Sequence, residues 1–321
     1  MSNSAKQNIF NLRKIMREKS VEAYIIPHHD ESFSEYVPKH KERLYWISGF
    51  SGSAGTLFIT NKELFLFTDG RYILQAKNQT KNLNCKIINI ANCTFLNFLK
   101  NNQSKFSNIA IESKTVSLLE YKNICKSISK KIKIINNNLI DLLWQRTNCK
   151  QDISKIFFLP TKYCGESSKN KLTKTSVYLS KENADYIFSQ DSESIAWLFN
   201  MRGADLPNTP LVFCSALIGK KNQKIFFENK QVPEKVKKYF PKETKIYAYS
   251  EMNEVLKKSC KNSTKIIIDQ KKLSLFNFNL LKKITNNLSV KDDILLSYRS
   301  IKNPTEIKSS KLAHIFDAVS L

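Results

Sequence analysis

The sequence has only seven glycines, and four of them lie within a span of 22 residues: Gly49, Gly52, Gly55 and Gly70. Glycine is nearly absent elsewhere, so we expect these four positions to require a conformation that a side chain would forbid. The G-x-x-G-x-x-G spacing is not that of a dinucleotide site, and no Lys-Ser/Thr follows as in a P-loop. The stretch also leads into a strand, whereas a phosphate-binding turn opens a helix. We therefore predict a tight turn where a helix passes close to a sheet.

Arginine is also scarce. Only seven of the 52 basic residues are Arg, and the formal net charge is +24. The lysines are spread along the chain, whereas proteins that read nucleic acids gather basic residues and often use Arg on base edges. We expect solvated lysine faces, weak attraction to polyanions and no specific nucleic-acid site.

Recognisable catalytic motifs are lacking. The four histidines belong to no H-E-x-x-H or Cys-His signature, and no G-x-S-x-G is present. The seven cysteines include no C-x-x-C pair, and residues 1–20 do not form a signal peptide. No apolar run reaches the length of a membrane span. We expect free thiols, a cytoplasmic protein without membrane contact, and no catalytic or metal-binding residue in this chain.

A pair of histidines beside carboxylates, His28-His29-Asp30-Glu31, raises the alternative of a metal site. Adjacent residues rarely point to one ion, and no further ligand follows at a recognisable spacing. A polar loop at the end of a strand is the favoured interpretation, and the role of residues 28–38 stays open.

Apolar patterning predicts alternating helices and strands in the first half. The predicted strands are 22–27, 56–60, 64–68, 86–90, 108–112 and 132–135. The predicted helices are 4–19, a helix starting near Asp69, 95–99, 116–128 and 139–144. This alternation is typical of an α/β sandwich. A polar stretch, 148–171, predicts the first domain boundary.

The second half repeats the first. Residues 184–188 echo 23–26, and Ile195–Gly203 echoes Tyr45–Gly49. Two related α/β domains are therefore expected. The predicted strands are 211–216, 225–227, 246–249 and 266–269, and the predicted helices are 252–260 and 273–284.

A helix start lies near the end of the chain. Asn303 is suited to the N-cap, Pro304 to the first turn, and Glu306 completes a capping box. An apolar face follows at helical spacing: Leu312, Ile315, Phe316 and Val319. We expect this face to lack a partner within the 321 residues.

Several separate motifs resemble one family. Residues 48–55 (Ser-Gly-Phe-Ser-Gly-Ser-Ala-Gly), followed by Thr68-Asp69-Gly70-Arg71-Tyr72, are similar to the N-terminal domain of Xaa-Pro aminopeptidases (aminopeptidase P) of the creatinase/prolidase superfamily. Residues 193–210 resemble the second domain of these enzymes, and residues 301–317 resemble the first helix of their catalytic "pita-bread" domain. The histidine often found where Ser32 stands is missing here.

The resemblance implies a fold, a domain plan and a function. It implies two related three-layer α/β domains with mixed sheets, residues 1–150 and 151–300, and the first helix of a truncated catalytic domain, residues 301–321. It implies the substrate-gating and dimerisation portion of a metallopeptidase that removes the residue preceding proline. The family's two divalent metals, usually manganese, belong to the third domain, so none is expected on this chain. Proline-containing peptides and a second copy of the chain are the implied partners.

The structural or interface candidates are Trp46, Gly49, Phe50, Gly52, Ser53, Gly55, Asp69, Gly70, Arg71, Trp197, Arg202 and Gly203. Asp69 is suited to a helix N-cap, and Arg71 to contact with a partner. Two other hypotheses stay open: a stand-alone, non-catalytic binding module derived from the family, and a basic nucleic-acid-binding protein supported by charge alone.

Overall fold

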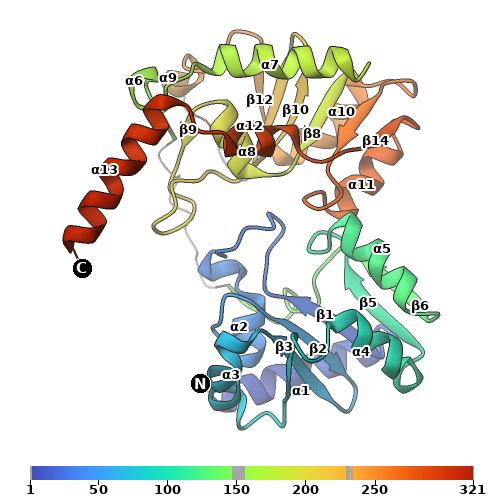
Figure 1. The fold of residues 1–321 in the computed structure, drawn as a ribbon. Coiled ribbons are helices and arrows are strands. Elements are labelled where there is room, and N and C mark those ends of the chain that lie inside the picture. The colour runs from blue at the N-terminus through green and yellow to red at the C-terminus, as the bar shows by residue number, and fades with distance from the viewer. Residues whose placement is uncertain (1, 147–155, 229–231, 233, 321) are drawn as a thin grey trace. The chain divides into compact units, whose positions relative to one another are not determined.

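The computed structural model describes residues 2–146, 156–228, 232 and 234–320. The chain divides into two compact units (Figure 1). The first unit comprises Met1–Lys150 with Ser274–Asn277, and the second comprises Gln151–Leu273 with Phe278–Leu321. The domain boundary predicted between residues 150 and 151 lies in 147–155, outside the described residues.

The first unit is a mixed six-stranded sheet of order β4-β3-β2-β1-β5-β6. Its strands are β1 (Ala23–Pro27), β2 (Thr56–Thr60), β3 (Leu64–Thr68), β4 (Lys86–Asn89), β5 (Asn108–Glu112) and β6 (Lys131–Ile135). Its helices are α1 (Ser2–Glu18), α2 (Arg43–Ser48), α3 (Ile73–Thr80), α4 (Phe95–Asn102) and α5 (Leu118–Ser127), with 3-10 turns η1 (Lys39–Lys41), η2 (Gly70–Tyr72) and η3 (Gln103–Lys105).

Helices cover both faces of this sheet. Leu12 of α1, Leu44 of α2 and Ala76 of α3 are fully buried against one face. The other face carries a cluster of phenylalanines contributed by β2, β3, α4 and the chain before β5: Phe58, Phe65, Phe67, Phe95, Phe98 and Phe106. Because strand side chains alternate between the two faces, one short apolar strand can supply both layers.

The second unit has a mixed six-stranded sheet of order β12-β11-β10-β8-β13-β14. Its strands are β8 (Tyr186–Ser189), β10 (Cys214–Gly219), β11 (Gln223–Phe227), β12 (Thr244–Ala248), β13 (Ile266–Ile268) and β14 (Leu288–Val290), and a separate pair is formed by β7 (Phe157–Phe158) and β9 (Met201–Arg202). The remaining helices are α6 (Thr161–Cys164), α7 (Ser168–Lys181), α8 (Ser192–Leu198), α9 (Glu234–Lys237), α10 (Met252–Ser259), α11 (Leu275–Lys282), α12 (Ile294–Ser300) and α13 (Pro304–Ser320), with the 3-10 turn η4 (Tyr249–Glu251).

The two sheets have the same topology. In each, the central strand pairs antiparallel with a hairpin on one side and parallel with a following strand on the other: β1 with β2 and β5, β8 with β10 and β13. The hairpins β2–β3 and β10–β11 have the same register and connecting turns of equal length. The predicted pair of related α/β domains with mixed sheets is confirmed.

Two predicted elements differ from the structure. Residues 139–144 form turns rather than a helix, because the Asn138 side chain accepts a hydrogen bond from the Ile140 N–H and holds the backbone in a local turn. The strand predicted at 211–216 begins at Cys214 and ends at Gly219. The strand starts late because the Phe213 N–H donates a hydrogen bond to the Asp205 carboxylate rather than to a neighbouring strand.

The predicted start of α13 is confirmed. The Glu306 N–H donates to Asn303 Oδ1 at 3.0 Å, and the Asn303 N–H donates to Glu306 Oε2 at 2.9 Å. Its apolar face is exposed as expected: Leu312 by 51%, Ile315 by 58%, Phe316 by 63% and Val319 by 82%. No helix in the described ranges has the length and apolarity needed to cross a bilayer.

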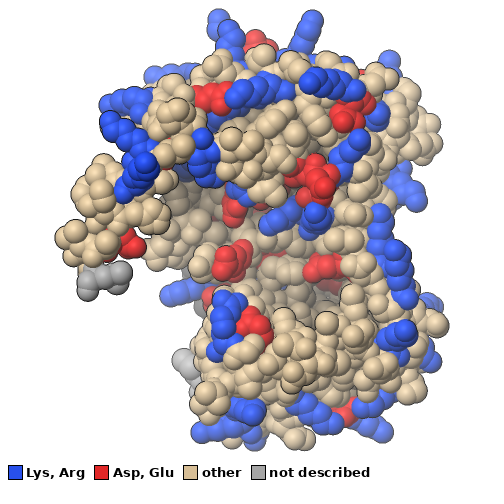
Figure 2. All heavy atoms as spheres, viewed as in Figure 1, with Lys and Arg blue, Asp and Glu red and all other residues tan. Residues whose placement is uncertain are grey.

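The thiols and lysines match the expectations from composition. Cys85, Cys93, Cys125, Cys164 and Cys260 are not in disulfides, and Cys149 lies outside the described residues. Figure 2 shows Lys and Arg scattered over the visible face rather than gathered into one patch.

Candidate functional site

The glycine-rich turn, residues 49–55, connects α2 to β2. Gly49 ends α2 in the left-handed region, with φ +73°, and its N–H donates to the Tyr45 carbonyl at 2.7 Å. A residue with a side chain is strained in this conformation, which accounts for glycine here.

Gly52 and Gly55 are required by space rather than by backbone angle. A Cβ at Gly52 would lie 2.3 Å from Phe50 Cζ, and one at Gly55 would lie 3.0 Å from another atom of the same ring. Phe50 is 1% exposed, so its ring has no room to move away. Gly70 differs from the prediction, because its φ is not positive and its nearest neighbour to an added Cβ is 3.8 Å away.

The glycine-rich turn is held against α3 and the turn before it. Tyr72 meets the Phe50 ring edge-on, and its hydroxyl lies 2.8 Å from Ser53 Oγ. The Ser51 N–H donates to Gln79 Oε1 at 3.0 Å. These contacts give the turn a packing role, and no backbone N–H cradle for a phosphate is needed to explain its glycines.

Asp69 caps the helical turn that begins at Gly70, as predicted. Its Oδ1 accepts from the Arg71 N–H at 3.0 Å, and its Oδ2 accepts from Arg71 Nη2 at 2.8 Å. The hydrogen bond from the Arg71 side chain lowers the pKa of Asp69. The Arg71 side chain remains 70% exposed, so it is accessible as well as locally paired.

The other sequence candidates are divided between the two units. Trp46, in the first unit, stacks on Trp144 with ring centroids 5.7 Å apart. Trp197, Arg202 and Gly203 belong to the second unit, where Arg202 donates to the Met201 carbonyl. Nine of the twelve candidates therefore belong to the first unit and three to the second.

The structure instead gathers charged residues outside the carboxyl ends of β1 and β5. Arg43 donates from Nε to Asp141 Oδ1 at 2.8 Å and from Nη2 to Glu31 Oε1 at 2.6 Å. Lys41 Nζ lies 3.2 Å from Glu31 Oε2 and 3.5 Å from Asp30 Oδ2. We call Asp30, Glu31, Lys41, Arg43 and Asp141 the ionic network.

Asp30, Lys41 and Arg43 of the ionic network are buried, whereas Glu31 and Asp141 are partly exposed. Asp30 is fully buried and Arg43 is 5% exposed. Burial works against charge on Glu31, but Lys41 and Arg43 outweigh it and hold the pKa of Glu31 well below its usual range. Ion pairs removed from water in this way need every partner, because the loss of one leaves a buried charge unpaired.

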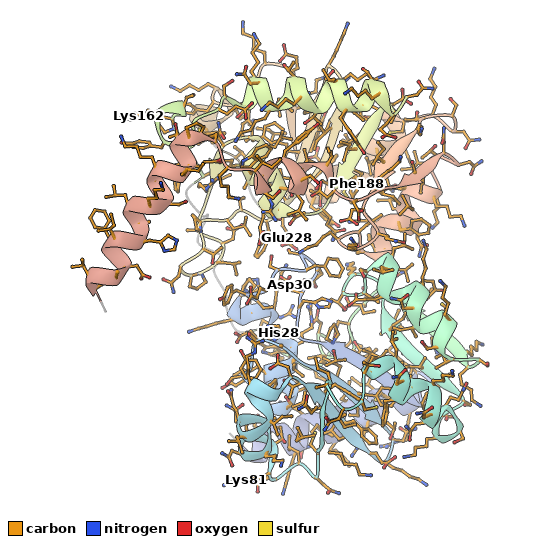
Figure 3. The ribbon with its side chains drawn as sticks, in the orientation of Figure 1. His28, Asp30, Lys81, Lys162, Phe188 and Glu228 are labelled. Atoms are coloured by element: carbon orange, nitrogen blue, oxygen red, sulfur yellow. The ribbon has the colours of Figure 1, made fainter. Side chains whose placement is uncertain are left out.

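The histidine pair joins this region without forming a metal site. His28 and Asp30 lie in the loop after β1 (Figure 3). His28 Nε2 lies 3.3 Å from the Glu35 carbonyl, and His29 Nε2 lies 2.9 Å from the Thr115 carbonyl. Lys41 and Arg43 already neutralise the neighbouring carboxylates. In the described part of the chain, no group of three or more His, Cys, Asp or Glu is arranged to hold a metal ion.

Glu112, the last residue of β5, is a buried acid beside the ionic network. It is 3% exposed, and its Oε2 accepts from Asn138 Nδ2 at 2.7 Å and from Thr115 Oγ1 at 3.0 Å. Burial raises its pKa to about 7, with Arg43 opposing the rise. A buried acid that titrates near neutrality is a candidate functional group.

A cavity of about 240 Å³ lies beside Glu112. Its walls come from the ends of β1 and β5, the start of β2, and helices α4 and α5: Ile25, Pro27, Thr56, Phe95, Leu96, Ile111, Glu112, Thr115, Val116, Glu120, Asn123 and Ile124. The helix after β1 and the helix after β5 cover opposite faces of the sheet. Open α/β sheets bind ligands at the carboxyl edge of such a strand pair.

The second unit has its own buried polar groups. Lys171 is 1% exposed, and its Nζ donates to the Trp197 carbonyl at 2.8 Å and to Asn200 Oδ1 at 2.7 Å. It also lies 4.1 Å from the centre of the Trp197 ring. Burial lowers the pKa of Lys171 to about 8. Trp197 thus contributes a carbonyl and a ring face to a buried cation.

Sequence reasoning did not identify Lys171, Arg43 or Glu112. One lysine out of 45, and an acid at the end of an apolar strand, carry no local signal. The only signal available was positional, since Glu112 follows Ile109-Ala110-Ile111 where an apolar strand should end.

Comparisons with known proteins identify both units. Residues 9–141 and residues 147–306 each match a model described as a creatinase/prolidase N-terminal domain. The chain is 34% identical to Xaa-Pro aminopeptidase 1 of Dictyostelium discoideum over 98% of its own length and 52% of that protein. It is 31% identical to a probable Xaa-Pro aminopeptidase P of Pyricularia oryzae, over 99% and 54% of the two chains.

A solved structure shows the same fold. The X-prolyl aminopeptidase of Caenorhabditis elegans, described as a cytosolic enzyme with a di-nuclear active site, superposes with a TM-score of 0.85 at 22% identity, over 95% of this chain and 52% of that one. The chain spans about half the length of the relatives that it matches, and it is homologous to their N-terminal portion.

Proposed function

Because this chain belongs to the creatinase/prolidase family, with two copies of its N-terminal domain, we propose that it acts as the N-terminal portion of a metal-dependent Xaa-Pro aminopeptidase. The observation that carries this proposal is the 34% identity to the Dictyostelium enzyme along 98% of the chain. A match that runs through both domains and the linker supports the aminopeptidase branch rather than the shared domain alone.

The proposed role of the two units is to gate rather than to catalyse. Carboxylates in the first unit are paired with Lys41 and Arg43, and the described residues offer no group for the metals of the complete enzyme. We expect the units to shape the entrance to an active site, to limit peptide size and to provide dimer contacts. The location that we propose is the cytosol, as for the Caenorhabditis relative.

The helix α13 supports this role. Its N-cap residue Asn303 also donates to the Cys164 carbonyl at 2.9 Å, so the second unit fixes where the helix begins. Beyond that anchor, the row Leu312, Ile315, Phe316 and Val319 is exposed. We propose that this helix belongs to the catalytic domain and that the row packs within it.

The test is an aminopeptidase assay of the purified chain. The purified 321-residue protein, supplied with Mn²⁺, should not release the first residue of an Arg-Pro-Pro peptide. Turnover would show that the metal site lies in this chain and would overturn the proposed division of labour. The intact mass of the native product is the companion measurement, since a working enzyme should exceed 37.1 kDa.

A stand-alone binding module of the same family is the second candidate. A native product of 37.1 kDa would favour it. A nucleic-acid-binding role remains an alternative based on charge alone. Sub-micromolar DNA binding with a steep salt dependence at physiological ionic strength would favour it.

A further inference from the structure

We propose that the apolar cavity in the first unit binds a neutral aromatic molecule of about the size of one ring. This is the cavity described above, which lies between the ends of β1 and β5 and the helices α4 and α5. The proposal concerns residues of the first unit only. It is independent of the aminopeptidase role proposed above.

The cavity lies on the face of the sheet that carries Ile25 and Ile111. Both side chains are buried and line it, together with Phe95 of α4 and Ile124 of α5. Successive side chains of a strand point to opposite faces, so the Glu112 carboxylate leaves the sheet on the other face, where it accepts from Asn138. A ligand in the cavity therefore meets hydrocarbon rather than this acid.

The second unit shows that the fold does not require this cavity. The two hairpins have the same register, so Ile25 corresponds to Phe188, and its partner Phe58 corresponds to Leu217. The ring stands on the central strand in the second unit and on the neighbouring strand in the first. The cavity that Phe188 lines is about 20 Å³, against about 240 Å³ beside Ile25. The smaller side chain thus leaves space on the sheet where the related domain has a ring.

The volume of the cavity suits one aromatic body. An apolar cavity of about 150 Å³ is enough to hold benzene and stays dry, because water finds few partners there. At about 240 Å³, this cavity accommodates a substituted ring. Phe95 on its wall already meets Phe67 edge-on, and a ligand ring can adopt the same arrangement. Such a ring would recover the dispersion contacts that the open space forfeits.

The polar groups of the lining select a neutral ligand. Glu120, at an exposed position, accepts from the Ser117 N–H at 2.8 Å in the capping box of α5. The residues that line the cavity, all within the described ranges, include no Lys or Arg. A carboxylate ligand would therefore find no counter-charge. An ammonium ligand would find only Glu120, whose charge is engaged in the capping box and screened by water.

The probes are three molecules that share one ring: toluene, benzylamine and benzoate. Binding to the isotope-labelled 321-residue chain is followed by the methyl signals of Ile25, Ile111 and Ile124. At about pH 7, where benzylamine is a cation and benzoate is an anion, toluene should shift these methyls and bind about tenfold or more tightly than either. Equal affinity of the three probes, or no methyl shift at millimolar toluene, overturns the proposal.

A variant that adds one ring tests the location. Ile25→Phe places on β1 the residue that the second unit has at the corresponding position, and it should fill the cavity and weaken toluene binding about tenfold or more. Ile134→Phe, the matched control, adds the same ring at an exposed position of β6 and should bind toluene as the parent does. A folded Ile25→Phe chain that binds toluene normally contradicts the assignment of the cavity.

A second variant keeps the test decisive if Ile25→Phe overpacks the sheet. Leu96 is half-buried on α4 at the edge of the cavity, so a larger side chain there has solvent on one side. Leu96→Trp should be folded by its amide spectrum and should reduce the rise in melting temperature that toluene gives the parent. An undiminished rise in this variant would show that toluene binds elsewhere, which overturns the proposal.

Discussion

Glu112 and Asp269 occupy equivalent positions in the two sheets. Ala110 pairs with Tyr24 in the first sheet, Ile267 pairs with Ile187 in the second, and the two acids stand two residues further along. Burial raises the pKa of both carboxyl groups. A half-buried or buried acid at this edge is therefore a shared feature of the two domains, although their surroundings differ.

Glycine substitutions should distinguish the two reasons for glycine in the first unit. Gly52→Ala forces a Cβ into the buried Phe50 ring and should lower the free energy of unfolding by about 1–3 kcal/mol. Gly49→Ala places a side chain at positive φ and should cost about 1–2 kcal/mol. Gly70→Ala is the control, expected within about 0.5 kcal/mol of the parent in urea unfolding. A Gly70 variant as unstable as the Gly52 variant would refute the packing account.

The pH dependence of stability should report the ionisation of the Glu112 carboxyl group. Its pKa of about 7 in the folded state lies above the ordinary value of 4.5, so the folded state holds the proton more tightly. Protonation of Glu112 therefore makes its full contribution to the stability of the fold below about pH 4.5, and this contribution is lost as the pH rises toward 7. Glu112→Gln should remove this dependence and should be more stable than the parent at about pH 8, by about 2–3 kcal/mol. Glu254→Gln, at an exposed position on α10, is the control. Parallel pH profiles for the parent and the Glu112 variant would contradict the assignment.

Removal of the buried lysine should destabilise the second unit. Lys171→Met keeps the apolar stem but leaves the Trp197 carbonyl and Asn200 Oδ1 without their donor, at an expected cost of about 2–4 kcal/mol. Lys169→Met, on an exposed position of the same helix, should cost less than about 0.5 kcal/mol. Tryptophan fluorescence during denaturation reports the difference, and equal stability of the two variants would show that Lys171 is dispensable.

The exposed row on α13 should cause self-association of the 321-residue chain. Replacement of Leu312, Ile315, Phe316 and Val319 by Gln removes this apolar surface and keeps good helix formers. Sedimentation velocity should then show less association at high concentration, without loss of secondary structure. A control in which Lys308 and Lys311, also exposed on α13, become Gln should not have this effect. If deletion of residues 304–321 unfolds the second unit instead, the helix is part of that unit.

Local patterns predicted most of the strands. Thr56–Thr60, Leu64–Thr68 and Asn108–Glu112 have the predicted bounds, because short apolar β-branched runs flanked by polar residues have few alternatives to a buried strand. The capping box at Asn303 could also be predicted from the sequence, since its two hydrogen bonds link residues three positions apart. The short strand Leu288–Val290 and the helix Ile294–Ser300 were not predicted, because their positions depend on a sheet and a neighbouring helix formed elsewhere in the chain.

The candidate site was beyond sequence reasoning for a physical reason. The partners of Arg43 lie 12 and 98 residues away, and those of Lys171 lie 26 and 29 residues away. A charged residue becomes tolerable in a core only when such distant partners converge, and no local pattern records that convergence. The glycine-rich turn was visible early because the ring that crowds Gly52 and Gly55 belongs to Phe50, a few positions away, although Tyr72 and Gln79 also hold the turn.

Some of the scattered lysines lie on the edge strands of the two sheets, and this position has a further consequence. Three of the four edge strands place lysine along the open side or face: Lys86 in β4, Lys131 and Lys133 in β6, and Lys245 in β12. Lysine on an edge strand opposes pairing with another chain, so part of the excess positive charge protects against edge-to-edge aggregation. The fourth edge, β14, consists of Leu288, Ser289 and Val290, and Val290 is 42% exposed. Strand addition from another molecule is therefore least opposed at β14.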